Sequence, residues 1–196
     1  MFAGNLVNLM GDMKMRITID PEIVKKSFDA VKADSSLAES RRLQDRGFPV
    51  VEMLQALAMR PELLASFSTF GSSVYPGGIL DRVLKEKVIL KASLMNECQF
   101  CASSHISLMR QLGISDDPVV AVENLDLLSP REKAALAYTE VVTRDSNRVS
   151  DILFAEIKQH FSDPEIVELT FLIGFINMLN RFNNALGIRY KGDYDA

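Results

Sequence analysis

The chain has 196 residues, of which 47% are hydrophobic and 24% charged, a balance typical of a soluble globular protein with one core or two small helical halves. The net charge of −4 provides no basic excess to attract a phosphate backbone, so we expect no nucleic-acid partner. No apolar stretch is long enough to span a bilayer, and the N-terminus lacks the pattern of a signal peptide. We therefore expect a cytoplasmic protein without a membrane partner.

Helix signals dominate the chain after its first residues. Residues 1–19 show no helical pattern, and we expect them to be extended or poorly ordered. Asp20, Ser129 and Ser162 each stand one or two positions before a proline, as an N-cap residue does at the start of a helix. Strand signals are scarce. The sequence therefore predicts one compact all-α domain over residues 20–196, with roughly seven to nine helices.

A short internal similarity suggests a duplication. Residues 86–90 resemble residues 132–136, and in both places the segment begins a helix that is followed by a polar break and another helix. A two-fold internal repeat would explain the similarity. The alternative is that amphipathic helices often begin in the same way.

The most informative segment contains both cysteines of the chain. Cys98 and Cys101 stand three residues apart, and His105, one of only two histidines, follows four residues later. On a helix these three side chains share one face, which brings the two thiols within disulfide range. We expect Asn96 to be the N-cap, so that Cys98 lies in the first turn, where the helix dipole favours a thiolate. His105 would then exchange a proton with Cys101, because imidazole titrates near neutral pH.

Three interpretations of this segment compete. A redox-active pair is favoured, because in a reducing compartment closely spaced cysteines are more often redox-active or metal-binding than structural. A zinc site formed by Cys98, Cys101 and His105 would need a fourth ligand, and only His160 or a carboxylate remains to supply it. An inert pair is the third interpretation, since free cysteine packs well as a small apolar residue.

Glu86 is the next candidate for the site. It precedes Cys98 by twelve residues, a separation of about 18 Å on one unbroken helix. It reaches the thiols only if the chain breaks near Asn96 and the next helix folds back. Taken alone, a glutamate between Lys85 and Lys87 is more often a solvated charge.

These motifs resemble the alkyl hydroperoxidase D and carboxymuconolactone decarboxylase superfamily, and in particular its peroxidase-related branch. The specific part of the resemblance is the spacing of Glu86, Cys98, Cys101 and His105. The resemblance covers most of the chain beyond its first twenty residues. Supporting segments are residues 60–64, 86–90 and 182–187.

The resemblance implies an alkyl hydroperoxidase D-like helical fold and a thiol-dependent peroxidase. Cys101 would be the peroxidatic cysteine and Cys98 the resolving one, with Glu86 and His105 in a proton relay. The helix dipole alone would choose Cys98 as the more acidic thiol, so the two arguments assign the roles differently. A hydroperoxide would be the substrate and an external dithiol or protein the reductant, with no metal or organic cofactor. The family also implies a homo-oligomer.

Phe100 departs from the family pattern. Stronger peroxidases of this type carry a second histidine at this position, directly before the second cysteine, and a phenyl ring cannot carry a proton. The alternatives are therefore a thiol redox sensor without useful turnover, or a carboxymuconolactone decarboxylase-like protein that is not a peroxidase. The decarboxylase branch generally lacks the cysteine pair, which argues against decarboxylation.

Two other groups receive structural interpretations. The asparagines of the last helix are assigned to helix capping and the surface, as is typical of this residue type, with the lining of a polar interface as the alternative. The Met-rich segment 53–59 is expected to pack against a partner subunit, with a monomer core as the plain alternative. The asparagines concerned are Asn177, Asn180, Asn183 and Asn184.

Overall fold

The computed structural model describes residues 15–31, 37, 45 and 50–192 of the chain. This part is helical and contains no strand, which confirms the all-α prediction. The helices are α1 (Pro21–Asp29), α3 (Glu52–Ala58), α4 (Pro61–Ser72), α5 (Arg82–Met95), α6 (Gln99–Gln111), α7 (Pro118–Glu123), α8 (Pro130–Asp145), α9 (Asp151–His160) and α10 (Asp163–Leu186), with short 3-10 helices η1 (Leu125–Leu127) and η2 (Ser146–Arg148). In this part of the chain, no helix is both long and apolar enough to cross a membrane.

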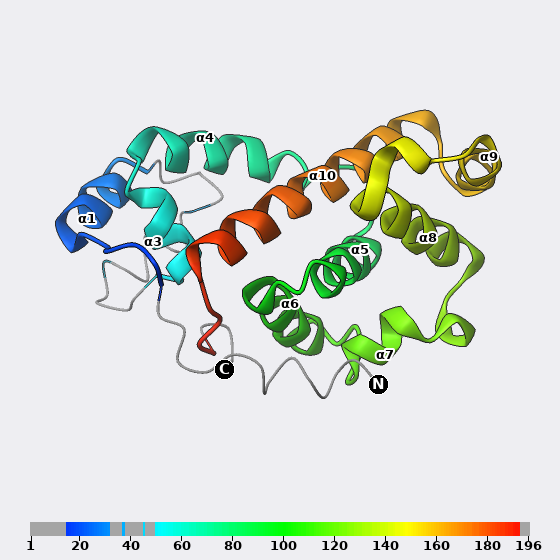
Figure 1. Ribbon diagram of the computed structural model, residues 1–196, viewed down its shortest axis with the longest axis horizontal. Helices are drawn as coiled ribbons and strands as arrows, with labels where there is room; N and C mark the ends of the chain where they lie inside the picture. The colour runs from blue at the N-terminus through cyan, green and yellow to red at the C-terminus, as the bar shows by residue number, and fades with distance from the viewer. Residues whose placement is uncertain (1–14, 32–36, 38–44, 46–49, 193–196) are drawn as a thin grey trace.

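The longest helix, α10, crosses the molecule from α9 at one end to α3 at the other (Figure 1). Helix α5 lies in the middle and packs against α6, α8 and α10. Helices α1, α3 and α4 form one end, whereas α8 and α9 form the other (Figure 1). Because α5 has neighbours on several sides, its side chains can contact several other helices.

The helices begin at the caps that the sequence indicates. The Asp20 carboxylate accepts hydrogen bonds from the first backbone N–H groups of α1. Ser129 with Glu132, and Ser162 with Glu165, form reciprocal capping boxes at the starts of α8 and α10. These interactions satisfy backbone donors that a helix start otherwise leaves unpaired.

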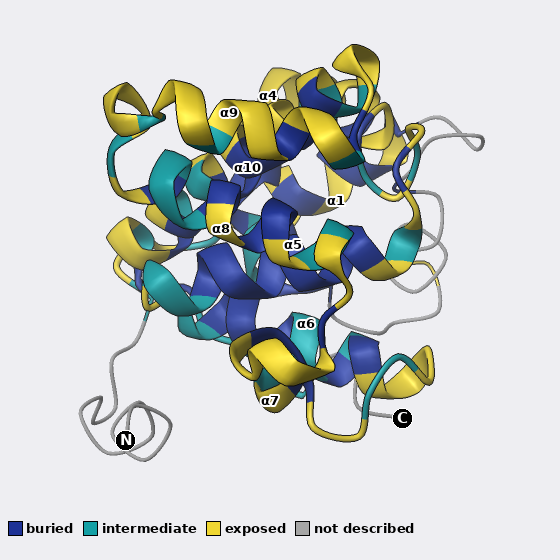
Figure 2. Ribbon diagram, turned by 90° about the vertical axis from the view of Figure 1, so that its right-hand side faces the viewer, coloured by how far each residue is buried: buried dark blue, intermediate teal, exposed yellow. Residues whose placement is uncertain are grey.

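Helix α5 is buried along most of its length (Figure 2). Glu86 and Lys85 are both 0% exposed, so the interpretation of Glu86 as a solvated charge flanked by lysines is wrong. The reason is that buried charges are tolerated when each has a partner of opposite sign. The lysine pairs are Lys85 with Glu168, Lys87 with Glu132, and Lys91 with Glu123 and Glu140.

The Met-rich segment of α3 contributes to the core of the chain. Leu54, Leu57 and Ala58 are buried against the rest of the chain, while Met53 and Met59 are partly buried beside them. This segment is therefore explained by packing within one chain, which was the alternative. The homo-oligomer stays a prediction, but this segment no longer supports it.

The N-terminal prediction falls partly outside the described residues, which begin at residue 15. Residues 15–19 contain no helix or strand, and Arg16 is hydrogen-bonded to the end of α10 through Leu186 O and Ala185 O. The extended N-terminus, the single domain over residues 20–196 and the internal repeat stay predictions.

Candidate active site

The chain turns between α5 and α6 at Asn96 and Glu97. Asn96 closes α5 as its C-cap, and Glu97 has a φ of 50°, a left-handed conformation that residues other than glycine rarely adopt. Cys98 is the N-cap of α6, and its sulfur accepts a hydrogen bond from the Cys101 N–H at 3.4 Å. The prediction that Asn96 caps α6 and that Cys98 lies in its first turn is therefore wrong, because Asn96 ends the preceding helix.

The two cysteines are free thiols in contact with each other. Their Sγ atoms lie 2.7 Å apart, and both side chains are buried, at 0% exposed for Cys98 and 3% for Cys101. A disulfide has an S–S distance of about 2.05 Å, so oxidation would require only a small approach of the two sulfurs.

The two thiols differ in acidity. The hydrogen bond from the Cys101 thiol holds the pKa of Cys98 below its ordinary value, and the Cys101 backbone N–H and the amides of α10 add to this effect against burial. The same hydrogen bond to Cys98, together with burial, raises the pKa of Cys101. Cys98 is therefore the more acidic thiol of the pair.

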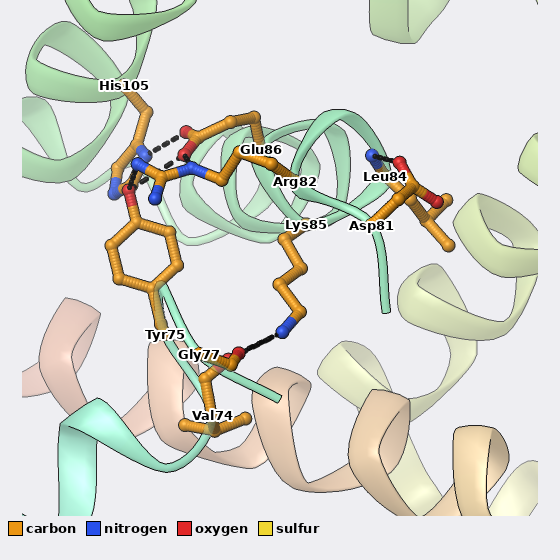
Figure 3. Close-up of polar contacts among 9 residues, drawn as sticks. All are labelled: Val74, Tyr75, Gly77, Asp81, Arg82, Leu84, Lys85, Glu86 and His105. Atoms are coloured by element: carbon orange, nitrogen blue, oxygen red, sulfur yellow. Dashed lines mark hydrogen bonds and ion pairs between the residues drawn. The ribbon is translucent and has the colours of Figure 1, made fainter. Parts of the chain in front are cut away.

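Glu86 projects from α5 towards α6, where it meets His105 (Figure 3). Its Oε2 lies 2.6 Å from Nδ1 of His105, and its Oε1 accepts hydrogen bonds from the Tyr75 hydroxyl at 2.7 Å and Nε of Arg82 at 2.6 Å. Arg82 also donates from Nη2 to the Tyr75 hydroxyl at 2.7 Å. The reversal of the chain at the end of α5 thus brings Glu86 and His105 together across nineteen positions of sequence.

The ionisation state of Glu86 determines how His105 is oriented. Burial alone would raise the pKa of the Glu86 carboxyl, but hydrogen bonds from His105 and Tyr75 and the charge of Arg82 outweigh burial and hold this pKa below its ordinary value of 4.5. An ionised carboxylate only accepts hydrogen bonds, so the Nδ1–H of His105 donates to Glu86. In the neutral imidazole this leaves Nε2 as a proton acceptor.

A cavity of about 330 Å³ adjoins this cluster. Four of its polar wall residues are Cys101, His105, Tyr75 and Arg82, whereas Cys98 is not part of the wall. The wall is otherwise largely apolar, with Met53, Leu54, Phe67, Ile89, Phe100, Leu108, Phe175, Ile176 and Leu179 among its members. A molecule entering this cavity would lie against Cys101 and His105 together.

Amide side chains of α10 complete the surroundings of the sulfurs. Asn183 donates from Nδ2 to Sγ of Cys101 at 3.1 Å, and Asn180 donates to the Ser93 hydroxyl at 3.2 Å. Asn180 and Asn183 are both 0% exposed, so the interpretation of these two as capping or surface residues is wrong. Their three-residue spacing puts them on one face of a helix that is otherwise apolar, and this signal could have identified them.

Sequence reasoning also missed Tyr75 and Arg82. Arg82 stands four residues before Glu86, a spacing at which opposite charges meet on a helix, and this signal was available. Tyr75 lies in a loop rich in Gly, Ser and Pro, where nothing in the pattern indicates its contact with Glu86. Among the described residues, no group of three His, Cys, Asp or Glu side chains is placed to hold a metal ion.

Comparisons with known proteins show which proteins this chain is similar to. Residues 61–141 match the model of the carboxymuconolactone decarboxylase family. The chain is 33% identical over 114 residues to the uncharacterized protein YdfG of Bacillus subtilis, a match that covers 56% of this chain and 78% of the relative. It is 32% identical over 116 residues to the uncharacterized protein YnjA of Escherichia coli, covering 58% of this chain and 64% of the relative.

Solved structures show the same fold. An uncharacterized peroxidase-related protein from Silicibacter sp. TM1040 superposes with a TM-score of 0.74 at 24% identity, covering 94% of this chain and 97% of that protein. A protein of unknown function from Agrobacterium tumefaciens, suggested to be the antioxidant defence protein AhpD, superposes with a TM-score of 0.62 at 27% identity, covering 67% and 92%.

Proposed function

This chain belongs to the carboxymuconolactone decarboxylase family, and we propose that it is a thiol-dependent peroxidase that reduces hydroperoxides through a disulfide cycle of Cys98 and Cys101. One observation carries the proposal. A free, contacting pair of thiols presents one sulfur, Cys101, on a cavity wall beside His105, and a buried carboxylate orients that imidazole.

The cycle begins with the charge on the thiol pair. Cys98 is the more acidic thiol at rest, but only Cys101 lies on the cavity wall. The hydrogen bond across the 2.7 Å between the sulfurs allows the Cys101 proton to pass to Cys98, which moves the negative charge to Cys101. Acidity alone would make Cys98 the attacking thiol, whereas access to the cavity would make it Cys101. The proton transfer allows Cys101 to attack although Cys98 is the more acidic thiol.

Oxidation then occurs at Cys101. Its thiolate attacks an oxygen of the hydroperoxide, so that an S–O bond forms and the O–O bond breaks. The departing alkoxide takes from His105 the proton that Nε2 received when the thiol pair ionised, and it leaves as an alcohol, while the sulfur becomes a sulfenic acid. Cys98 attacks this sulfur, water leaves, and the disulfide forms. An external dithiol or protein reductant returns two electrons and two protons.

Glu86 acts through His105 rather than on the peroxide. By accepting from Nδ1–H, the carboxylate fixes the tautomer whose Nε2 can take up and return a proton. Tyr75 and Arg82 keep Glu86 ionised, because both donate hydrogen bonds to its Oε1. These four side chains form one connected hydrogen-bond network on the wall of the cavity and directly behind it.

The cavity favours an organic hydroperoxide over hydrogen peroxide. Its volume of about 330 Å³ is at the lower end of the range for small-molecule sites, and its wall is mainly apolar. An alkyl or aryl group would bury apolar surface there, whereas hydrogen peroxide would gain nothing from it.

A thiol redox sensor is the second candidate, and Phe100 favours it. Phe100 is 4% exposed and its ring packs edge-on against Tyr190, so the start of α6 is apolar and offers no further proton carrier beside the sulfurs. In a sensor the disulfide would form once and persist, since nothing would return electrons rapidly.

Steady-state consumption of cumene hydroperoxide with dithiothreitol separates the two candidates. A peroxidase consumes many equivalents of peroxide per protein, and Cys101→Ser abolishes the consumption. A sensor loses two thiols per protein in a titration with one equivalent of peroxide and then stops. If thiol titration finds both cysteines intact after peroxide treatment, both candidates are excluded.

A further inference from the structure

The carboxamide of Asn183 belongs to the site, but the cycle described above does not use it. Its Nδ2 donates to Sγ of Cys101 at 3.1 Å from a fully buried position. Its Oδ1 is a buried oxygen that has no hydrogen-bond partner among the residues that the structure describes. Buried polar groups in folded proteins are nearly always paired, so this unpaired oxygen requires an explanation.

The neighbouring amides of α10 differ from Asn183 in this respect. Asn180 donates to Ser93 and its oxygen accepts from Nδ2 of Asn96 at 2.9 Å. Asn184 donates to the backbone oxygen of Asn96 at 2.9 Å and is exposed. The unpaired oxygen thus belongs to the amide that donates to the sulfur on the cavity wall.

We propose that Asn183 serves both oxidation states of Cys101: its Nδ2–H donates to the thiolate, and its Oδ1 accepts the hydrogen of the sulfenic acid. The inference rests on the proposed peroxidase function. In the step concerned, the thiolate, a hydroperoxide and one proton from His105 become a sulfenic acid and an alcohol. The S–O bond forms, the O–O bond breaks, and the sulfur loses two electrons.

The need for a two-sided partner follows from this change. Before oxidation the sulfur is an anion that can only accept a hydrogen bond. After oxidation the S–O–H group is neutral and is a donor. A carboxamide carries a donor and an acceptor on one carbon, so it can serve both states without moving to another rotamer. It also adds no charge beside a buried anion, which an aspartate at this position would.

The titratable groups near Cys101 come from several elements, and Asn183 differs from them because it carries no charge. Helix α5 contributes the titratable Glu86 and α6 contributes His105, and these two are bonded to each other. The C-terminal segment contributes Tyr190, which packs on Phe100. Helix α10 presents neutral amides to the sulfurs, so the Asn183 N–H is a donor to Cys101 from a side chain that does not itself titrate.

Two measurements test the proposal in a Cys98→Ser background, where only one thiol remains. One tests the hydrogen bond to the thiolate, and the other tests the hydrogen bond from the sulfenic acid. The first is the rate of alkylation by iodoacetamide as a function of pH, which reports the thiolate and needs no peroxide. Asn183→Leu should move the midpoint up by about one pH unit and slow alkylation at neutral pH about tenfold, as the loss of one hydrogen bond to a charged group implies. Asn184→Ala, the matched control on the same helix, should leave the profile unchanged.

The second measurement is the lifetime of the sulfenic acid after one equivalent of cumene hydroperoxide, followed by dimedone trapping. Asn183→Leu should shorten it, whereas Asn183→Asp, which keeps an oxygen but loses the N–H donor, should retain the lifetime while still raising the alkylation midpoint. Coincident alkylation profiles for the parent, Asn183→Leu and Asn184→Ala would overturn the thiolate half. Equal lifetimes in all variants, or no sulfenic acid at all, would overturn the other half.

A measurement on the wild type covers the case in which Asn183→Leu does not fold. The side-chain amide resonance of Asn183 should titrate with the midpoint seen in alkylation, and an amide shift independent of pH would overturn the proposal. The peroxidase proposal fails separately, through an absence of hydroperoxide turnover, because the alkylation profile does not depend on turnover.

Discussion

Replacing Glu86 by glutamine tests the proton relay while keeping the shape of the side chain. In the wild type the Glu86 carboxylate accepts from Tyr75, Arg82 and His105. In Glu86→Gln one oxygen remains to accept from Tyr75 and Arg82, and the new NH₂ group then faces Nδ1 of His105. Nδ1 must now accept a hydrogen bond, so the imidazole carries its proton on Nε2 and can no longer act as a base towards the cavity.

The size of the effect follows from these contacts. A misplaced general base typically costs about 10²–10⁴-fold in rate, so we expect hydroperoxide turnover to fall by that factor. Loss of one charged hydrogen bond at this fully buried carboxylate should lower the free energy of unfolding by about 2 kcal/mol. For a chain of this size that corresponds to a fall in Tm of roughly 4–8 °C, which leaves the protein folded at 25 °C.

The assay compares kcat for cumene hydroperoxide in the wild type, Glu86→Gln and a matched control. Glu132→Gln is that control, because Glu132 likewise pairs with a cationic side chain of α5, Lys87 at 2.6 Å, but is not hydrogen-bonded to His105. Glutamine also preserves the capping box that Glu132 forms. If folded Glu86→Gln turns over within a few-fold of the wild type, or if both variants lose activity equally, the relay is wrong.

Four further predictions concern the thiols, the rate, acid stability and assembly. Peroxide-treated protein should lose two hydrogens within the peptide that contains Cys98 and Cys101, as mass spectrometry would show; two free thiols would contradict the redox interpretation. Wild-type activity should be weak with an alkaline optimum, and Phe100→His should raise turnover or move the optimum towards neutrality. Folding lowers the pKa of Glu86, so the contribution of its carboxylate to stability is complete above about pH 4.5 and is lost as the pH falls through the pKa of the folded state. Below about pH 4.5 the Tm of Glu86→Gln should therefore fall less steeply with pH than the Tm of the wild type. Light scattering should give a homo-oligomer, and a mass near the 21.9 kDa of one chain at micromolar concentration would contradict this.

The parts of the fold that the sequence predicts are those with local causes. Asp20, Ser129 and Ser162 cap helices because a short polar side chain can satisfy the free N–H groups of the next turn. The reversal near Asn96 was foreseen for the same reason, since a polar pair between two apolar helices permits a break. The assignment of Asn96 to the wrong helix shows the limit of such local signals: an asparagine can end one helix or begin the next.

The buried polar residues could not be predicted in this way. Glu86 and Lys85 are charged and lie on α5, where exposure is the ordinary expectation, yet both are buried, and most of their partners come from outside α5. Lys85 reaches Glu168 on α10, and Glu86 reaches Tyr75 in the preceding loop. A lysine's partner eighty-three residues away leaves no trace in a local pattern. The spacing of Asn180 and Asn183 marks their shared helix face, but the contact of Asn183 with Cys101 depends on how α10 crosses α6.

The asymmetry of the thiol pair suits both halves of the proposed cycle. In the oxidative half the peroxide needs the sulfur that lies on the cavity wall, which is Cys101. In the reductive half an incoming dithiol attacks one sulfur of the disulfide and expels the other, and the more acidic thiol is the better leaving group. Attack from the same cavity strikes Cys101 and expels Cys98, whose thiolate is already stabilised at the start of α6. A site with the acidic thiol on the cavity wall would favour the first attack but would expel the poorer leaving group in the second. The separation of access from acidity therefore suits the proposed cycle.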